Sequence, residues 1–353
     1  MDGGSGKPRR QEQEPATSEV AEVAPGVLRT QLPISLPGLG HVNCYLLADR
    51  RGVAVVDPGL PGPQSWRALV DRLRRAGYKP KHVHTVIVTH SHPDHFGGAG
   101  RLRDVHGAEV VSHRSFRTWF DPAEDDTTVD ADGQPLPAPS APWTGELPWR
   151  DGATLRPPLD RRLKYRVGRT LLRRFVRTPR PTRRLDDAEV IELAGREWVA
   201  LHTPGHTIDH LCLFDPVEGV VLSGDHVLPT ITPHISGLVG SEDPLTEFFH
   251  SLAKVAELDG VRQVLPAHGH PFTDLAGRAT AIRQHHEERL QVLRDAATEL
   301  GSATVEELSQ RLFRPRSWGP MAESETYAHL EHLRATGEAE ARKESGALRY
   351  RLT

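Results

Sequence analysis

Histidine and aspartate side chains gather in one short stretch of the sequence. His90, His92, Asp94 and His95 fall within six consecutive positions, directly after an apolar, strand-like run. On a loop that leaves a strand, His90 and His92 can project one way while Asp94 and His95 turn toward a neighbouring point. Imidazole nitrogens and carboxylates are ligands of zinc, so the stretch predicts a metal site. The alternative is a solvated histidine-rich turn, which three histidines beside an aspartate disfavour.

Downstream of this stretch, three more residues stand in matching contexts. His206, Asp225 and His268 each follow an apolar run and a turn that contains glycine or proline. With these residues the sequence resembles the metallo-β-lactamase superfamily, over roughly residues 27–275. Its ligand set resembles that of the dinuclear branch, which includes hydroxyacylglutathione hydrolases and related nucleases.

The resemblance implies a site for two metal ions and a hydroxide shared between them. One ion would be held by three histidines and the other by an aspartate and two histidines, with a further aspartate bridging both: His90, His92 and His206; Asp94, His95 and His268; and Asp225. Asp94 and Asp225 are thereby also the expected catalytic carboxylates. Two zinc ions about 3.5 to 4 Å apart would lower the pKa of the shared water toward neutrality. Manganese and iron are alternatives to zinc.

Asp57 closes a short β-branched run at residues 53–56. By the same resemblance it would accept an N–H from a ligand histidine and fix the tautomer of that ring. The alternative is an aspartate that only caps the turn before Pro58.

The resemblance implies hydrolysis, and it leaves the substrate open. A carboxylic thioester or ester comes first, because one metal can polarise the carbonyl while the bridging hydroxide attacks. Phosphodiester cleavage, as in an endoribonuclease, is the second possibility, and a non-enzymatic metal-binding or regulatory protein is the third. Asp225 stands where one penicillin-hydrolysing subclass has a metal-binding cysteine, which disfavours β-lactam hydrolysis.

Strand-like and helical runs alternate along the chain, which predicts an α/β fold; the resemblance implies the αββα metallo-β-lactamase sandwich. Strands are expected at residues 27–32, 42–47, 53–56, 85–89, 109–112, 189–193, 198–202, 210–214 and 220–223. Helices are expected at residues 65–76, 96–105, 246–258 and 276–300. The catalytic domain is predicted to span residues 24–275, after a disordered tail at residues 1–23.

Residues 121–184 are predicted to be an insertion that ends in a basic helix. Between residues 161 and 184 there are eleven basic residues and no acidic one, which leaves a formal charge of −14 on the rest of the chain. Apolar residues recur among the arginines at helical spacing. We therefore expect an anionic small-molecule substrate, with Arg173, Arg174 and His234 as candidate contacts. A solvated basic face is an equally weighted alternative.

Residues 276–353 are predicted to form a helical domain of winged-helix type. Helices are expected at residues 304–312 and 324–336, followed by a hairpin at residues 339–352. Residues 301–353 hold eight basic and eight acidic residues. A recognition helix that neutralises phosphates should be rich in Arg or Lys, so specific DNA binding is disfavoured, whereas RNA remains a possible partner.

The composition is that of a globular protein. Of 353 residues, 37% are hydrophobic and 26% are charged, and the formal net charge is −3. No apolar run reaches the length of about 18 residues that a membrane span needs. The two cysteines exclude a disulfide framework, and the lack of an apolar leader segment predicts a cytoplasmic protein. The sequence does not indicate the oligomeric state.

Overall fold

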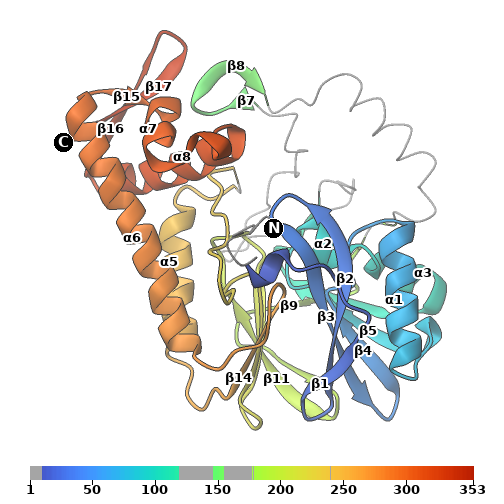
Figure 1. Cartoon of the computed structure of the whole chain (residues 1–353). Helices are drawn as coiled ribbons and strands as arrows, with labels where there is room; N and C mark the ends of the chain where they lie inside the picture. The colour runs from blue at the N-terminus through green and yellow to red at the C-terminus, as the bar shows by residue number, and fades with distance from the viewer. Residues whose placement is uncertain (1–9, 119–145, 155–176, 178, 239) are drawn as a thin grey trace, which may run out of the picture.

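Two mixed β-sheets pack face to face, with helices on their outer sides (Figure 1). The computed structural model describes residues 10–118, 146–154, 177, 179–238 and 240–353. The first sheet has the order β1-β2-β3-β4-β5-β6-β9 and the second has the order β10-β11-β12-β13-β14. The predicted α/β class is confirmed.

The first sheet changes from antiparallel to parallel pairing along its width. Strands β1 to β4 pair antiparallel, whereas β4, β5, β6 and β9 pair parallel. Its strands are β1 (Val20–Ala24), β2 (Val27–Leu36), β3 (Leu39–Asp49), β4 (Gly52–Val56), β5 (Val83–Ile87), β6 (Glu109–His113) and β9 (Arg183–Leu185). The outer face is covered by α1 (Pro63–Arg75) and α3 (Ala99–His106) (Figure 1). The short η2 (Pro80–His82) contacts α3.

The second sheet is a meander to which one parallel strand is added. Its strands are β10 (Val190–Leu193), β11 (Arg196–His202), β12 (Leu211–Asp215), β13 (Val220–Gly224) and β14 (Gln263–Pro266). Only β13 and β14 pair parallel, and α5 (Pro244–Ala256) connects them. Helices α5 and α6 (Leu275–Leu300) cover the outer face of this sheet (Figure 1).

Apolar side chains form three buried layers that hold the sheets and helices together. Between the two sheets, Val56 and Ile87 of the first sheet pack in one cluster with Trp198 and Leu213 of the second. A second cluster lies under α1 and α3, and a third lies under α5 and α6. Because strands β4, β5 and β6 have apolar residues on both faces, the first sheet is buried from two sides.

The N-terminal segment is not the disordered tail that the sequence predicted. Residues Gln11–Gln13 form η1, and β1 pairs with β2 from Val20 onward. Glu12 is fully buried, and its carboxylate accepts hydrogen bonds from the backbone N–H groups of Thr230 and Ile231 at 2.9 and 3.1 Å. The prediction was wrong for residues 10–23 because these contacts join positions more than 200 residues apart.

The C-terminal module (residues 275–353) contains the helices α6, α7 and α8 and a small sheet. After α6 come β15 (Ala303–Thr304), α7 (Val305–Leu312), η3 (Pro315–Ser317), α8 (Pro320–Ala335) and the hairpin of β16 (Ala339–Glu344) and β17 (Ala347–Leu352). The strands β7 (Glu146–Leu147) and β8 (Arg150–Thr154) join this sheet through β17.

This pairing crosses the expected domain boundary, because β7 and β8 belong to the predicted insertion. The buried Trp149 strengthens the contact by donating Nε1–H to Glu323 of α8 at 2.9 Å. The end of the predicted basic segment, at Arg183 and Arg184, lies in strand β9 and not in a helix, while Arg173 and Arg174 lie outside the described residues.

None of the described helices is long and apolar enough to cross a membrane.

Candidate metal centre

The ends of four strands meet at one edge of the sandwich and bring the predicted ligands together. Parallel strands end at the same edge of their sheet, so the residues that follow β13 and β14, Asp225 and His268, become neighbours. The loop after β5 carries His90 and His92 to this edge, and the loop after β11 carries His206. The one-turn helix α2 (Pro93–Phe96) adds Asp94 and His95.

Backbone hydrogen bonds fasten the two sheets to each other at this edge. The Leu211 N–H donates to the Thr89 carbonyl at 2.8 Å, and the Asn43 N–H donates to the Ala267 carbonyl at 2.7 Å. Gly224 must be glycine, because its φ is 51° and a Cβ there would lie 2.6 Å from Nε2 of His210. That nitrogen accepts a hydrogen bond from the Asp225 N–H at 3.0 Å, which orients the aspartate.

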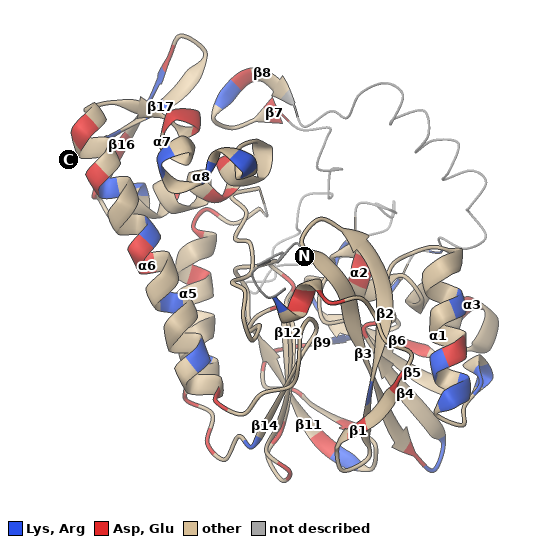
Figure 2. Cartoon of the chain, viewed as in Figure 1, with Lys and Arg blue, Asp and Glu red and all other residues tan. Residues whose placement is uncertain are grey.

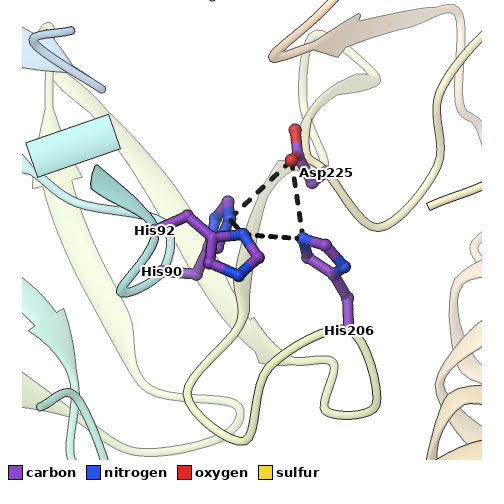
Figure 3. A group of neighbouring side chains, drawn as sticks. All are labelled: His90, His92, His206 and Asp225. Carbon is purple, nitrogen blue, oxygen red and sulfur yellow. Dashed lines mark hydrogen bonds and ion pairs between the residues drawn. The ribbon is translucent and has the colours of Figure 1, made fainter. Parts of the chain in front are cut away.

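The first cluster consists of His90, His92, His206 and Asp225, whose side chains converge in Figure 3. Nδ1 of His92 lies 3.0 Å from Nε2 of His90 and 3.0 Å from Nε2 of His206. The Oδ2 atom of Asp225 lies 3.8 Å from the same nitrogen of His90 and 3.5 Å from that of His206. Three nitrogens and one oxygen therefore face a common point, as a zinc ligand set requires.

The second cluster consists of Asp94, His95 and His268. Oδ2 of Asp94 lies 3.7 Å from Nε2 of His95 and 3.5 Å from Nε2 of His268. Asp225 also reaches this cluster, with Oδ2 3.6 Å from His95 Nε2 and Oδ1 3.3 Å from His268 Nε2. One carboxylate therefore contacts histidines of both clusters.

The remaining ring nitrogens of three histidines are held by the surrounding chain. Oδ2 of Asp57 lies 2.8 Å from Nδ1 of His95, and it also accepts the hydroxyl hydrogen of Thr89 at 2.8 Å. Nδ1 of His206 donates to the carbonyl of His234 at 2.8 Å, and Nδ1 of His268 donates to the carbonyl of His41 at 2.6 Å. These bonds fix each ring so that Nε2 faces the cluster.

Whether the site fits metal ions can be judged from buried polar atoms that lack a hydrogen-bond partner. Nε2 of His95, Nε2 of His268 and Oδ1 of Asp225 are buried and have no hydrogen-bond partner among the described residues. An unpaired buried polar atom costs free energy, so native proteins rarely keep three in one place. Divalent cations would satisfy all three, and the imidazole and carboxylate donors suit them.

The electrostatic environment divides the ligand histidines into two groups. Burial lowers the pKa of His90 and His92 well below the ordinary value, which keeps these rings neutral and able to donate a lone pair. Burial opposes protonation of His95 as well, but the carboxylates of Asp94, Asp57 and Asp225 raise its pKa well above the ordinary value. The pKa of His268 is raised in the same way, against burial, chiefly by Asp225.

Metal binding is therefore expected to release protons and to strengthen as the pH rises. His95 and His268 are protonated below their raised pKa values in the metal-free protein, so protons compete with the metal at low pH and the competition ends as the pH rises. Titration calorimetry of the metal-free chain with zinc, in two buffers of different ionisation enthalpy, measures the released protons. Equal heats in both buffers, with an affinity unchanged between about pH 6 and 8, would contradict this assignment.

The sequence did not indicate the carbonyl groups that orient His206 and His268. A backbone acceptor has no side-chain signature, and the His268 and His41 contact spans 227 positions. Of the candidate substrate contacts, His234 lies beside the centre, because its backbone carbonyl accepts the Nδ1–H of His206. Its side chain is 26% exposed.

Comparison with known proteins identifies the class to which this fold and site belong. The family model of the metallo-beta-lactamase superfamily matches residues 37–268. The chain belongs to this superfamily and is a metal-dependent hydrolase with a two-cluster His/Asp site.

Several relatives cover most of the chain. This chain is 26% identical to "Probable metallo-hydrolase YqjP" of Bacillus subtilis, over 84% of this chain and 89% of the relative. A hydroxyacylglutathione hydrolase of Pseudomonas aeruginosa is 25% identical over 79% of this chain and 84% of the relative. A crystal structure of a metallo-beta-lactamase family protein from Thermus thermophilus is 29% identical, with a TM-score of 0.71, and covers 94% of this chain and 100% of that chain.

Proposed function

We propose that this protein is a dinuclear zinc hydrolase that cleaves a carboxylic thioester or ester. The observation that carries the proposal is the position of Asp225, whose two oxygens approach histidines of both clusters. A shared carboxylate is what two adjacent metal ions require. The similarity to a hydroxyacylglutathione hydrolase supports a thioester as the scissile group.

The ligand residues and Asp57 would each have a defined role at the site. The two ions, when bound, supply an activated water as nucleophile and a Lewis acid for the carbonyl oxygen. His90, His92 and His206 would hold one position, and burial keeps the rings of His90 and His92 neutral by lowering their pKa values. Asp94, His95 and His268 hold the other, and the carboxylates lower the net charge of the site. Asp57 keeps His95 in the orientation in which Nε2 faces inward.

We extend the proposal to an anionic substrate, on the strength of the basic segment at residues 161–184. Changing Arg173 and Arg174 together to glutamine is expected to raise KM for an anionic substrate several-fold, since a typical surface ion pair contributes about 0.2–1 kcal/mol. KM for a neutral ester should stay the same, because it has no charge to lose. Steady-state kinetics on a charged and an uncharged ester with one leaving group measure the difference, and equal effects on both would remove these arginines from substrate binding.

The C-terminal module is proposed to have a winged-helix arrangement. The order of α7, α8 and the β16–β17 hairpin supports this assignment. Lys, Arg, Asp and Glu are interspersed along α6 and α8 (Figure 2). Because residues 301–353 carry equal numbers of acidic and basic side chains, we propose that this module shapes the active site and does not bind nucleic acid.

The substrate class is tested by comparing reactions on one zinc-loaded preparation. We expect turnover of an acyl-glutathione thioester, and no cleavage of a single-stranded RNA or of a chromogenic phosphodiester. Asp225→Ala, prepared in parallel, controls for contaminating esterase. Cleavage of RNA or the phosphodiester without thioester or ester turnover would replace the proposed reaction with phosphodiester hydrolysis.

A further inference from the structure

The loop that follows β13 connects the metal centre to the C-terminal module. Within this loop, the backbone carbonyl of His234 accepts the Nδ1–H of the ligand His206 at 2.8 Å. The imidazole of the same residue contacts α8, where its Nδ1 lies 3.1 Å from Oε2 of Glu325. His234 therefore touches both a metal ligand and a helix of the C-terminal module.

Glu325 is built into the protein as a buried carboxylate. It is 8% exposed, and its Oε1 is ion-paired with Nη1 of Arg289 on α6. Burial alone would raise its pKa, but the hydrogen bond from His234 and the charge of Arg289 lower it to about 2. The ion pair with Arg289 and the hydrogen bond with His234 thus favour the ionised form of Glu325.

An ionised carboxylate only accepts hydrogen bonds, and this fixes the role of each nitrogen of His234. Nδ1 must be the donor to Glu325. Nε2 is the nitrogen left over, and it has no hydrogen bond to any other residue in the described part of the chain. The imidazole is thereby held in a set orientation and is partly open to solvent.

The loop is fastened to α8 at two further points. The Gly237 N–H donates to the carbonyl of Ser324 at 3.2 Å, and the hydroxyls of Ser236 and Ser324 lie 2.8 Å apart. Gly237 allows this close approach, since a Cβ there would lie 2.4 Å from Cδ1 of Tyr327. These contacts hold the loop against α8 and so keep His234 beside Glu325.

We propose that Glu325 is a positioning residue of the catalytic centre: it orients the imidazole of His234 so that Nε2 is available to the bound substrate. This inference rests on the proposed hydrolytic function and adds a residue to it that the C-terminal module supplies. It gives that module a role in catalysis that does not involve nucleic acid.

Glu325 could act on the reaction through the imidazole of His234, or through the backbone carbonyl of His234 that holds His206. Variants separate the side-chain route from the backbone route. Glu325→Ala removes the acceptor, Glu325→Gln keeps an acceptor oxygen, and His234→Ala removes the ring but leaves the carbonyl that holds His206. The matched control is Glu323→Ala, because Glu323 lies on the same helix, is also 8% exposed, and bonds to Trp149. Metal content and melting temperature of every variant report on folding and on the His206 contact.

If the side-chain route holds, Glu325→Ala and His234→Ala each lower kcat by roughly 10- to 100-fold and leave the metal content unchanged. The double variant should be no slower than His234→Ala, and Glu325→Gln should recover part of the rate. Glu323→Ala should keep the kcat of the parent protein, although it melts at a lower temperature because the buried Trp149 N–H loses its acceptor. Additive losses in the double variant, loss of metal in Glu325→Ala, or unchanged kcat would each overturn the proposal.

A measurement independent of activity separates failure of this inference from failure of the proposed function. In the zinc-loaded protein labelled with 15N-histidine, the Nδ1–H of His234 should give a slowly exchanging resonance that disappears in His234→Ala and Glu325→Ala but survives in Glu325→Gln. Its presence supports the positioning contact even if no thioester or ester is turned over. Its absence, in a protein that does turn over a thioester, overturns the role of Glu325 alone.

Discussion

Replacing Asp225 with alanine is expected to remove bound metal and hydrolysis together. Its carboxylate lies within 3.3–3.8 Å of ring nitrogens of His90, His95, His206 and His268, so the change removes a ligand from both clusters. A metal site is worth several kcal/mol to the transition state, and each 1.4 kcal/mol is tenfold in rate, so kcat should fall by about 1000-fold or more. Elemental analysis and steady-state kinetics on one preparation measure both effects.

Asp215→Asn provides the control for this experiment. Asp215 is also buried, at the end of a strand of the second sheet. It accepts backbone hydrogen bonds from Val217 and Glu218 and is ion-paired with Arg196 at 2.9 Å, but it belongs to neither cluster. The asparagine oxygen can still accept the backbone bonds, and the ion pair that is lost includes no ligand of either cluster, so two metal ions and full turnover are expected. An Asp225→Ala protein that keeps near-normal turnover would contradict a site shared by both clusters.

Replacing Asp57 with asparagine is expected to weaken metal binding at the second cluster without unfolding the chain. Oδ2 of Asp57 contacts both Nδ1 of His95 and the hydroxyl of Thr89, and Oδ1 accepts the Thr89 N–H at 2.9 Å. Asparagine loses one of the two acceptor oxygens but tolerates the positive φ of 54° at this position. Loss of such a partner costs roughly 10- to 100-fold in metal affinity or activity. Competition with a chelator should therefore show one weakened site and one unchanged site.

Two comparison variants define this second prediction. Asp57→Ala should lose the same affinity and also melt at a lower temperature, since alanine is strained at a positive φ. Asp49→Asn changes an aspartate at the opposite end of the same sheet, where the carboxylate bonds to Arg51, and both sites should stay intact. If Asp57→Asn binds two metal ions as tightly as the parent protein, Asp57 does not orient His95.

Local patterns in the sequence predicted the core strands, and the resemblance to the metallo-β-lactamase superfamily implied the set of candidate ligands. The apolar runs that became β4, β5 and β13 are short, β-branched and closed by turns, so their ends could be predicted. Parallel pairing then places the residues after those ends at one edge, and the structure gathers His90, Asp94, Asp225 and the other predicted ligands there in two clusters.

Contacts between distant segments could not be predicted in this way. The N-terminal segment has a disorder-like composition, yet the carboxylate of Glu12 satisfies backbone donors of Thr230 and Ile231. Trp149 stands in a stretch with the pattern of a loop, but it is buried against α8. The contact between His234 and Glu325 joins a loop to a helix 91 positions away, and neither local sequence indicates the other.

Metal stoichiometry of the full chain tests the central claim most directly. The metal-free protein is titrated with zinc while bound metal and turnover of an acyl thioester are followed on the same sample. The account predicts two zinc ions per chain, with hydrolysis rising only as both sites fill. Saturation at a single ion, or full turnover in the metal-free protein, would contradict a dinuclear hydrolase built on Asp225.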